Sequence, residues 1–168
     1  FNMCRPLELV FANGQDKGEM VGIPTGDVTK MTTFEEFYDA YKKQMEYCIS
    51  LMVNADNAID VAHAERCPLP FLASMVDDCM ERGLTVEQGG AVYNFTGPQG
   101  FGIANMADSL YAIRKLVYEE KKVSMKEYKE ALAWNYDKGL DEKSASDMTE
   151  MILKGMQEGG MAISEDVA

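Results

Sequence analysis

The chain has 168 residues, of which 46% are hydrophobic, so the sequence suits one domain or part of a larger one. Its 28 acidic and 16 basic residues give a formal net charge of −12, which argues against nucleic-acid binding because phosphate contacts need clustered Lys and Arg. No apolar run reaches the roughly 18 residues of a membrane span, and no signal-peptide pattern opens the chain.

The N-terminal part of the sequence predicts a short helix and then an irregular connection. Residues 1–13 carry apolar side chains near one helical face, and Pro6 is tolerated if the helix begins near Arg5. Gly14 follows as a natural C-terminal cap. Residues 14–31 are rich in glycine, which predicts a connection without regular structure.

A longer helix is predicted next. Thr33 and Glu36 have the spacing of a capping box, in which each residue bonds the backbone N–H of the other. Apolar residues then recur at helical spacing to about residue 54, and residues 56–66 predict a second helical stretch. Two prolines stop any helix after it, at Pro68 and Pro70.

The middle of the sequence predicts one helix and one strand. Residues 71–82 predict a helix that ends at Gly83, and the short apolar run of residues 91–95 predicts a strand. A strand between helices is typical of a βα unit. Because a single strand cannot satisfy its own backbone hydrogen bonds, we expect its neighbours to lie in a larger α/β protein.

Three helices are predicted in the last part of the sequence. The first covers residues 105–120. Ser124 and Glu127 form a second capping box, which opens a helix that runs through Trp134. The third covers residues 144–156. The sequence as a whole therefore predicts a mostly helical segment with one clear strand.

Few residues suggest chemistry by their type and spacing. His63 and Cys67 could share a helix face as metal ligands, but two ligands do not make a site, and a structural histidine is the expected reading. An acidic cluster at Asp77, Asp78 and Glu81 is expected to be a solvated helix face. The four cysteines form no CxxC pair and are expected to be reduced and buried; they are Cys4, Cys48, Cys67 and Cys79.

The junction after the predicted strand is the best local candidate for a site. Residues 96–102 read T-G-P-Q-G-F-G and lead into a predicted helix. In α/β proteins ligands bind beyond the carboxyl ends of strands, and glycines allow close approach of a ligand or of backbone. Pro98 rules out a dinucleotide fingerprint, since it lacks an amide that such a loop needs. A ligand-binding loop and a tight structural turn both remain open on these features.

Several strings in the sequence resemble the glycyl radical enzymes, the group that contains pyruvate formate-lyase and diol dehydratases. The most specific is Y-N-F-T-G-P-Q-G at residues 93–100, and residues 1–14 resemble the helix that follows the catalytic cysteine loop of that family. The resemblance covers nearly the whole chain and fades after about Gly139. Its other carriers are R-C-P-L-P-F from Arg66, E-Q-G-G-A from Glu87, A-D-S-L from Ala107 and E-E-K-K from Glu119.

The resemblance implies a fold, a chemistry and partners. The fold is a ten-stranded α/β barrel, of which residues 1–168 form an internal, mostly helical segment of the catalytic domain. A glycyl radical generates a thiyl radical, which removes a hydrogen atom from a small substrate. An activating enzyme of the radical S-adenosylmethionine class installs the radical without oxygen. The parent is expected to be a homodimer in the cytoplasm, with a bacterial microcompartment as an alternative location, and neither nucleic acid nor a membrane is an expected partner.

The resemblance also fixes what this chain is expected to lack. The catalytic cysteine loop would precede Phe1 and the radical loop would follow Ala168, so we assign no catalytic residue and no metal or bound cofactor to the segment. Alone it is expected to be inactive. We expect Phe95, Thr96 and Gln99 to bind substrate near the barrel mouth. Three loop glycines are expected to be structural, Gly97, Gly100 and Gly102, the first two through their backbone conformation.

The strings F-N-M-C-R-P-L-E-L and G-I-P-T-G-D are closer to carbon–heteroatom lyases than to pyruvate formate-lyase. The first choice of activity is isethionate sulfite-lyase, beside a diol-dehydratase type. A formate C-acetyltransferase of the pyruvate formate-lyase type is an alternative. A small, non-catalytic helical interaction protein is another, from a different class.

Overall fold

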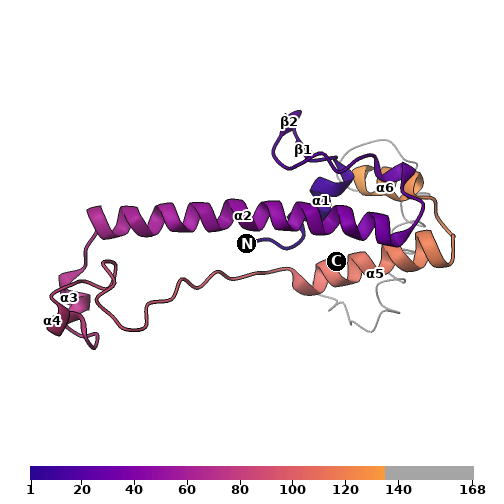
Figure 1. Ribbon diagram of the computed structural model, residues 1–168. Helices are drawn as coiled ribbons and strands as arrows, with labels where there is room; N and C mark the ends of the chain where they lie inside the picture. The colour runs from indigo at the N-terminus through magenta and orange to yellow at the C-terminus, as the bar shows by residue number, and fades with distance from the viewer. Residues whose placement is uncertain (135–168) are drawn as a thin grey trace. The chain divides into compact units, whose positions relative to one another are not determined.

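The computed structural model describes residues 1–134 of the chain (Figure 1). They belong to two compact units, which we describe separately. Among the described residues, the terminal unit consists of Asn2–Tyr47 together with residues 100–134. The central unit consists of Cys48–Gln99 and Phe1. The predicted helix at residues 144–156 lies outside the described residues.

The terminal unit is built from short helices around the first half of a long one. Its elements are α1 (Arg5–Phe11), β1 (Gln15–Asp16), β2 (Glu19–Met20), the 3₁₀-helix η1 (Val28–Lys30), the start of α2 (Phe34–Arg66), α5 (Ile103–Ile113), the π-helix η2 (Arg114–Glu119) and α6 (Met125–Trp134). The predicted start of α1 near Arg5 is confirmed, with Pro6 in its first turn.

The core of the terminal unit joins parts of the chain that are far apart in sequence. Val10 of α1, Phe37 of α2 and Ile113 of α5 are all at most 1% exposed. The rings of Phe11 and Phe37 pack with centroids 5.5 Å apart, and Phe11 also stacks on Tyr128 of α6 at 6.1 Å. The remaining buried members are Leu7, Val28, Ala40, Tyr41, Leu110, Val123 and Met125.

The glycine-rich connection is more ordered than predicted. Residues 15–20 form a small antiparallel hairpin, because Lys17 and Gly18 both adopt the positive φ of a tight two-residue turn. The connection is held by side chains. Gln44, fully buried on α2, donates from Nε2 to the carbonyl oxygen of Ile23 (2.5 Å) and accepts from its N–H (3.2 Å). It thus supplies the partner that a neighbouring strand would otherwise provide.

Both predicted capping boxes are confirmed. The Thr33 hydroxyl accepts from the N–H of Glu36 at 3.2 Å, and the Glu36 carboxylate accepts from the N–H of Thr33 at 3.3 Å. Ser124 and Glu127 repeat the arrangement at 3.2 and 2.8 Å before α6. These bonds satisfy N–H groups that the first turn of a helix leaves free. The pKa of Glu36 is lowered chiefly because the N–H of Thr32 also donates to its carboxylate, at 2.7 Å, and then by the N–H of Thr33. The pKa of Glu127 is lowered by the hydroxyl and the N–H of Ser124.

The helix predictions for the middle of the chain need two corrections. α2 is one continuous helix of 33 residues, because no glycine or proline interrupts residues 34–66. Conversely, the helix predicted at residues 71–82 is wrong. The chain forms two four-residue helices, α3 (Pro70–Ala73) and α4 (Cys79–Arg82), and Asp78 between them has a φ of 72°, which no α-helix accommodates.

The strand predicted at residues 91–95 is not formed. Ala91 and Val92 lie in a bend, and residues 93–100 have neither helix nor strand structure. Within residues 1–134 no strand lies beside them, so their backbone has no ladder to join. The helix predicted from residue 105 begins earlier, at Ile103, and its last turns are the π-helix η2. None of the helices among the described residues combines the length and apolarity that crossing a bilayer requires.

Candidate functional site

The segment formed by residues 91–102 is the extended connection that leads into α5 (Figure 1). Its aromatic side chains lie in the open: Tyr93 is 80% exposed and Phe95 is 84% exposed. Side chains of this size are normally buried in a folded protein. The exposed rings therefore mark the segment as a surface that meets something beyond residues 1–134.

Side chains at even and odd positions of this segment have different surroundings. Asn94 Nδ2 donates to the carbonyl oxygen of Val86 at 3.0 Å, and the Thr96 hydroxyl bonds Asp60 Oδ2 of α2 at 3.1 Å. Tyr93 and Phe95, by contrast, contact each other with ring centroids 6.2 Å apart. In extended backbone, residues two apart share a face and neighbours point oppositely. One face of the segment is thus anchored within the central unit, and the other is free of it.

The first residues of the chain run beside the end of this segment. In the central unit the Phe1 amino group donates to the carbonyl oxygen of Gln99 at 2.8 Å. In the terminal unit Asn2 forms a parallel bridge with Phe101, and the Met3 N–H donates to the carbonyl oxygen of Phe101 at 3.0 Å. This short parallel pairing is the only strand-like contact of residues 91–102 among the described residues.

The three loop glycines differ in their surroundings. Gly102 has a φ of 77°, and a Cβ there would lie 3.2 Å from Cys4 Sγ, so its glycine is required. Gly100 lies outside the left-handed region, and a Cβ there would lie 3.3 Å from Met3 Sδ. Gly97 also lies outside that region, and a Cβ would meet no described atom within 4 Å. The prediction that backbone conformation forces Gly97 and Gly100 is therefore wrong, since only Gly102 adopts a positive φ.

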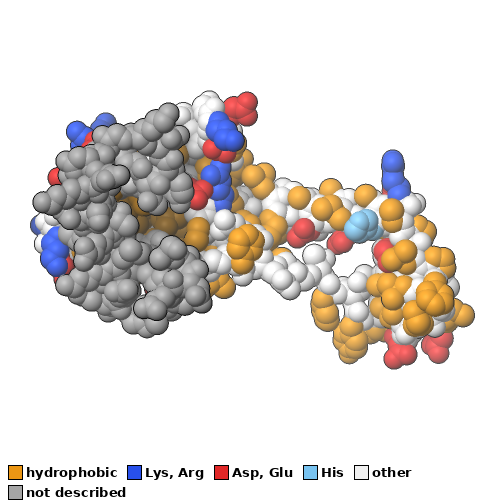
Figure 2. All heavy atoms as spheres, turned by 180° about the vertical axis from the view of Figure 1, so that it is seen from behind, with side chains coloured by type: hydrophobic (Ala, Val, Ile, Leu, Met, Phe, Trp, Pro, Cys, Tyr) orange, Lys and Arg blue, Asp and Glu red, His pale blue; other side chains and the backbone are white. Residues whose placement is uncertain are grey.

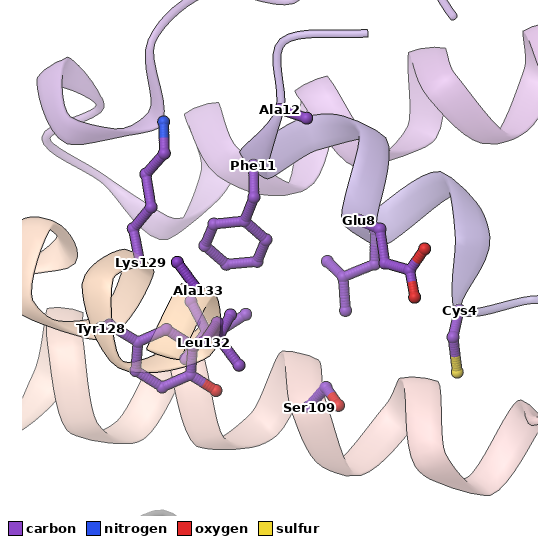
Figure 3. A pocket seen from close by; sticks show the side chains of 11 residues that line it. Cys4, Glu8, Phe11, Ala12, Ser109, Tyr128, Lys129, Leu132 and Ala133 are labelled. Carbon is purple, nitrogen blue, oxygen red and sulfur yellow. The ribbon is translucent and has the colours of Figure 1, made fainter. Parts of the chain in front are cut away.

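A second candidate site lies within the terminal unit, where α1, α5 and α6 line an open cavity of about 600 Å³ (Figure 3). Its walls are mainly apolar, with Glu8, Ser109 and Lys129 as polar groups. Burial, together with the nearby Glu8 carboxylate, raises the pKa of the Cys4 thiol, which keeps it protonated and poorly nucleophilic. The remaining lining residues are Leu7, Phe11, Ala12, Ile113, Tyr128, Leu132 and Ala133. Sequence reasoning missed this cavity because its walls come from three distant segments.

The other candidates from the sequence gain no support as sites. Within residues 1–134 no three His, Cys, Asp or Glu side chains are grouped to hold a metal ion. Asp77 and Glu81 are exposed, as expected of a solvated surface. The cysteines are free thiols, but the expectation that all are buried holds only for Cys79. Cys4 and Cys48 are half-buried, and Cys67 is exposed beside Pro68, where α2 has ended.

Comparison with known proteins decides the family. The family model for "Pyruvate formate lyase-like" proteins matches residues 1–157. The chain belongs to the pyruvate formate lyase-like family. The resemblance to glycyl radical enzymes, predicted from the strings at residues 66–71, 87–91 and 93–102, is thereby confirmed.

Solved structures show which members of the pyruvate formate lyase-like family the chain is similar to. A structure described as 1,2-propanediol dehydration in Roseburia inulinivorans is 59% identical, with a TM-score of 0.78 over 99% of this chain and 20% of that one. The glycerol-bound form of the B12-independent glycerol dehydratase from Clostridium butyricum is 45% identical, with a TM-score of 0.80 over 90% of this chain and 18% of that one.

Curated relatives agree with the structures. The trans-4-hydroxy-L-proline dehydratase of Clostridioides difficile is 37% identical over 81% of this chain and 18% of its own length. The isethionate sulfite-lyase of Oleidesulfovibrio alaskensis is 34% identical over 81% of this chain and 17% of its own length. The chain thus spans about a fifth of the length of the relatives it matches.

Proposed function

We propose that this chain is a segment of a glycyl radical enzyme that removes water from a small vicinal diol. The observation that carries the proposal is the 59% identity over 99% of the chain with the structure of 1,2-propanediol dehydration. The glycerol dehydratase at 45% identity supports the same substrate class. Isethionate cleavage, the first choice from the sequence, becomes the second candidate because the sulfite-lyase relative is 34% identical.

In this proposal residues 1–168 are an internal segment of the catalytic domain, a ten-stranded α/β barrel. The 91–102 segment supplies a barrel strand and the loop that follows it. Its exposed rings support that role, and so does the lack of a strand beside residues 93–98 within residues 1–134, since added neighbouring strands would supply hydrogen-bond partners there. Phe95, Thr96 and Gln99 remain proposed residues of the substrate region at the barrel mouth.

The catalytic cysteine and the radical glycine are assigned to the remainder of the parent protein. Residues 1–14 resemble the helix that follows the cysteine loop, and Phe1 lies beside Gln99. This contact supports a cysteine loop close to the 91–102 segment. The radical supplies the capacity to remove a hydrogen atom from substrate. A radical S-adenosylmethionine activase, a homodimeric parent and a location in the cytoplasm or a microcompartment complete the proposal.

The test is an anaerobic assay of the full-length protein that contains this segment, together with its activase. With 1,2-propanediol we expect propanal and water, and with glycerol 3-hydroxypropanal and water. Sulfite release from isethionate with no dehydration of either diol would assign the second candidate instead. Formation of acetyl-coenzyme A and formate from pyruvate would identify the acetyltransferase alternative. Absence of every product, despite a glycyl radical signal in electron paramagnetic resonance, would contradict the diol proposal.

A further inference from the structure

Nothing among the described residues requires position 97 to be a glycine. Its φ lies outside the left-handed region, and a Cβ placed on it would meet no atom of residues 1–134 within 4 Å. Its neighbours differ: Gly102 requires its positive φ, and Gly100 lies close to Met3 Sδ. Neither the backbone conformation nor the packing within residues 1–134 excludes alanine at position 97.

The lack of a side chain at position 97 affects one face of the segment. In extended backbone, position 97 shares its face with Phe95 and Gln99. The opposite face is the anchored one, because the Thr96 hydroxyl bonds Asp60 Oδ2 and Asn94 Nδ2 bonds the carbonyl oxygen of Val86. Gly97 therefore presents no side chain on the free face, between the positions of Phe95 and Gln99.

We propose that the free face formed by Phe95, Gly97 and Gln99 borders the substrate, and that Gly97 sets the size of the group accepted on the second carbon of the diol. This inference rests on the proposed function. A phenyl ring offers an apolar wall for an alkyl group, and the Gln99 amide both donates and accepts hydrogen bonds, as two hydroxyl groups require. The Thr96 hydroxyl bonds Asp60 on the anchored face, so the effect on substrate size is assigned to Gly97 and its free-face neighbours and not to Thr96.

The test compares two vicinal diols that differ by one methyl group, using the full-length activated enzyme. In Gly97→Ala we expect KM for 1,2-propanediol to rise at least about tenfold, while KM for ethane-1,2-diol changes less than about twofold. The expected size follows from the cost of misfitting one methyl group in a substrate pocket. Gly100→Ala is the matched control, because it adds the same methyl group to the opposite face, and we expect it to leave the ratio of the two KM values unchanged.

A second variant keeps the inference testable if Gly97→Ala folds poorly, which the glycyl radical signal and the thermal midpoint of each variant report. Phe95→Ala removes the phenyl ring and leaves more space for substrate on the same face. We expect it to raise kcat/KM for 1,2-butanediol relative to 1,2-propanediol at least about tenfold.

The outcomes separate this inference from the proposed function. If the wild-type enzyme dehydrates neither diol, the proposed function fails. If it dehydrates both, but Gly97→Ala leaves the KM ratio unchanged or Gly100→Ala shifts it equally, the assignment of Gly97 is overturned. Unchanged chain-length preference in Phe95→Ala would likewise overturn it.

Discussion

The terminal and central units differ in how far their own residues cover their apolar side chains. The terminal unit buries side chains from α1, α2, α5 and α6 in one cluster. The central unit buries three small residues, Ala73, Cys79 and Ala91, while Phe71 and Met80 are 79% and 71% exposed. Figure 2 shows hydrophobic side chains gathered on the surface around α3 and α4. The terminal unit thus carries much of its own core, whereas the central unit presents a surface made for contact with other parts of a protein.

The largest expected effect comes from removing a ring in the terminal core. Phe37→Ala should lower the free energy of unfolding by about 3–5 kcal/mol, because the fully buried ring leaves a cavity. Phe71→Ala, at an exposed ring, is the matched control in the 168-residue chain and should change it by less than about 0.5 kcal/mol. Urea unfolding followed by circular dichroism measures both.

The same pair of variants in the full-length protein sharpens the comparison. If other parts of the parent cover α3, Phe71→Ala should become destabilising by about 3 kcal/mol there. Equal, negligible effects of Phe71→Ala in the two proteins would show that this surface stays open in the parent.

The next largest effect concerns the buried amide of the terminal unit. Gln44→Leu should cost about 2–4 kcal/mol, since it leaves the N–H and carbonyl groups of Ile23 without partners. Gln15→Leu, at an exposed position of β1, provides the control and should change stability by less than about 0.5 kcal/mol. Thermal and urea unfolding measure both variants. A loss of unfolding free energy below about 1 kcal/mol for Gln44→Leu would mean that water replaces the amide.

A smaller effect is expected at the start of α6. Ser124→Ala removes the hydroxyl that accepts from the N–H of Glu127 and should cost about 1 kcal/mol. The pKa of Glu127 is lowered chiefly by its hydrogen bonds with Ser124. The stability that these bonds give to the folded state is therefore present above the ordinary carboxyl pKa, and it is lost as the pH falls through the lowered pKa of Glu127. Acid titration should therefore destabilise the wild type more than the variant. Parallel acid curves would contradict this assignment.

The smallest effect at neutral pH is expected for Tyr128→Phe. Burial raises the pKa of Tyr128 to about 12 from an ordinary value of 10.0. The stability associated with the neutral hydroxyl is therefore fully present below pH 10 and is lost as the pH rises from 10 towards 12. Stability measured by circular dichroism should fall less steeply over this range in Tyr128→Phe than in the wild type. Tyr111→Phe, at an exposed ring, is the control.

The sequence predicted elements whose signals are local. The capping boxes at Thr33 and Ser124 were predictable because each needs only residues three apart. The helix at residues 71–82 failed because apolar spacing does not reveal the left-handed Asp78 that divides it. The hairpin at residues 15–20 was missed because its strands are two residues long, too short for an alternating pattern.

The candidate site shows the same division between local and distant information. The string at residues 93–102 identified the family, yet its strand prediction failed since a strand depends on partners elsewhere in space. The sequence could not show that Thr96 bonds Asp60, 36 positions earlier, and so could not separate the anchored face from the free one. The same limit hid the cavity lined by Glu8, Ser109 and Lys129.

The discontinuity of the terminal unit has a consequence for the order of folding. Its core joins Val10 and Phe37 to Ile113 and Tyr128, and the whole central unit is translated between them. On the ribosome, α1 and the start of α2 must wait for these partners to be synthesised. Contacts of such long sequence separation form slowly, so the exposed apolar faces of the nascent chain are open to chaperones and to misassembly during that interval.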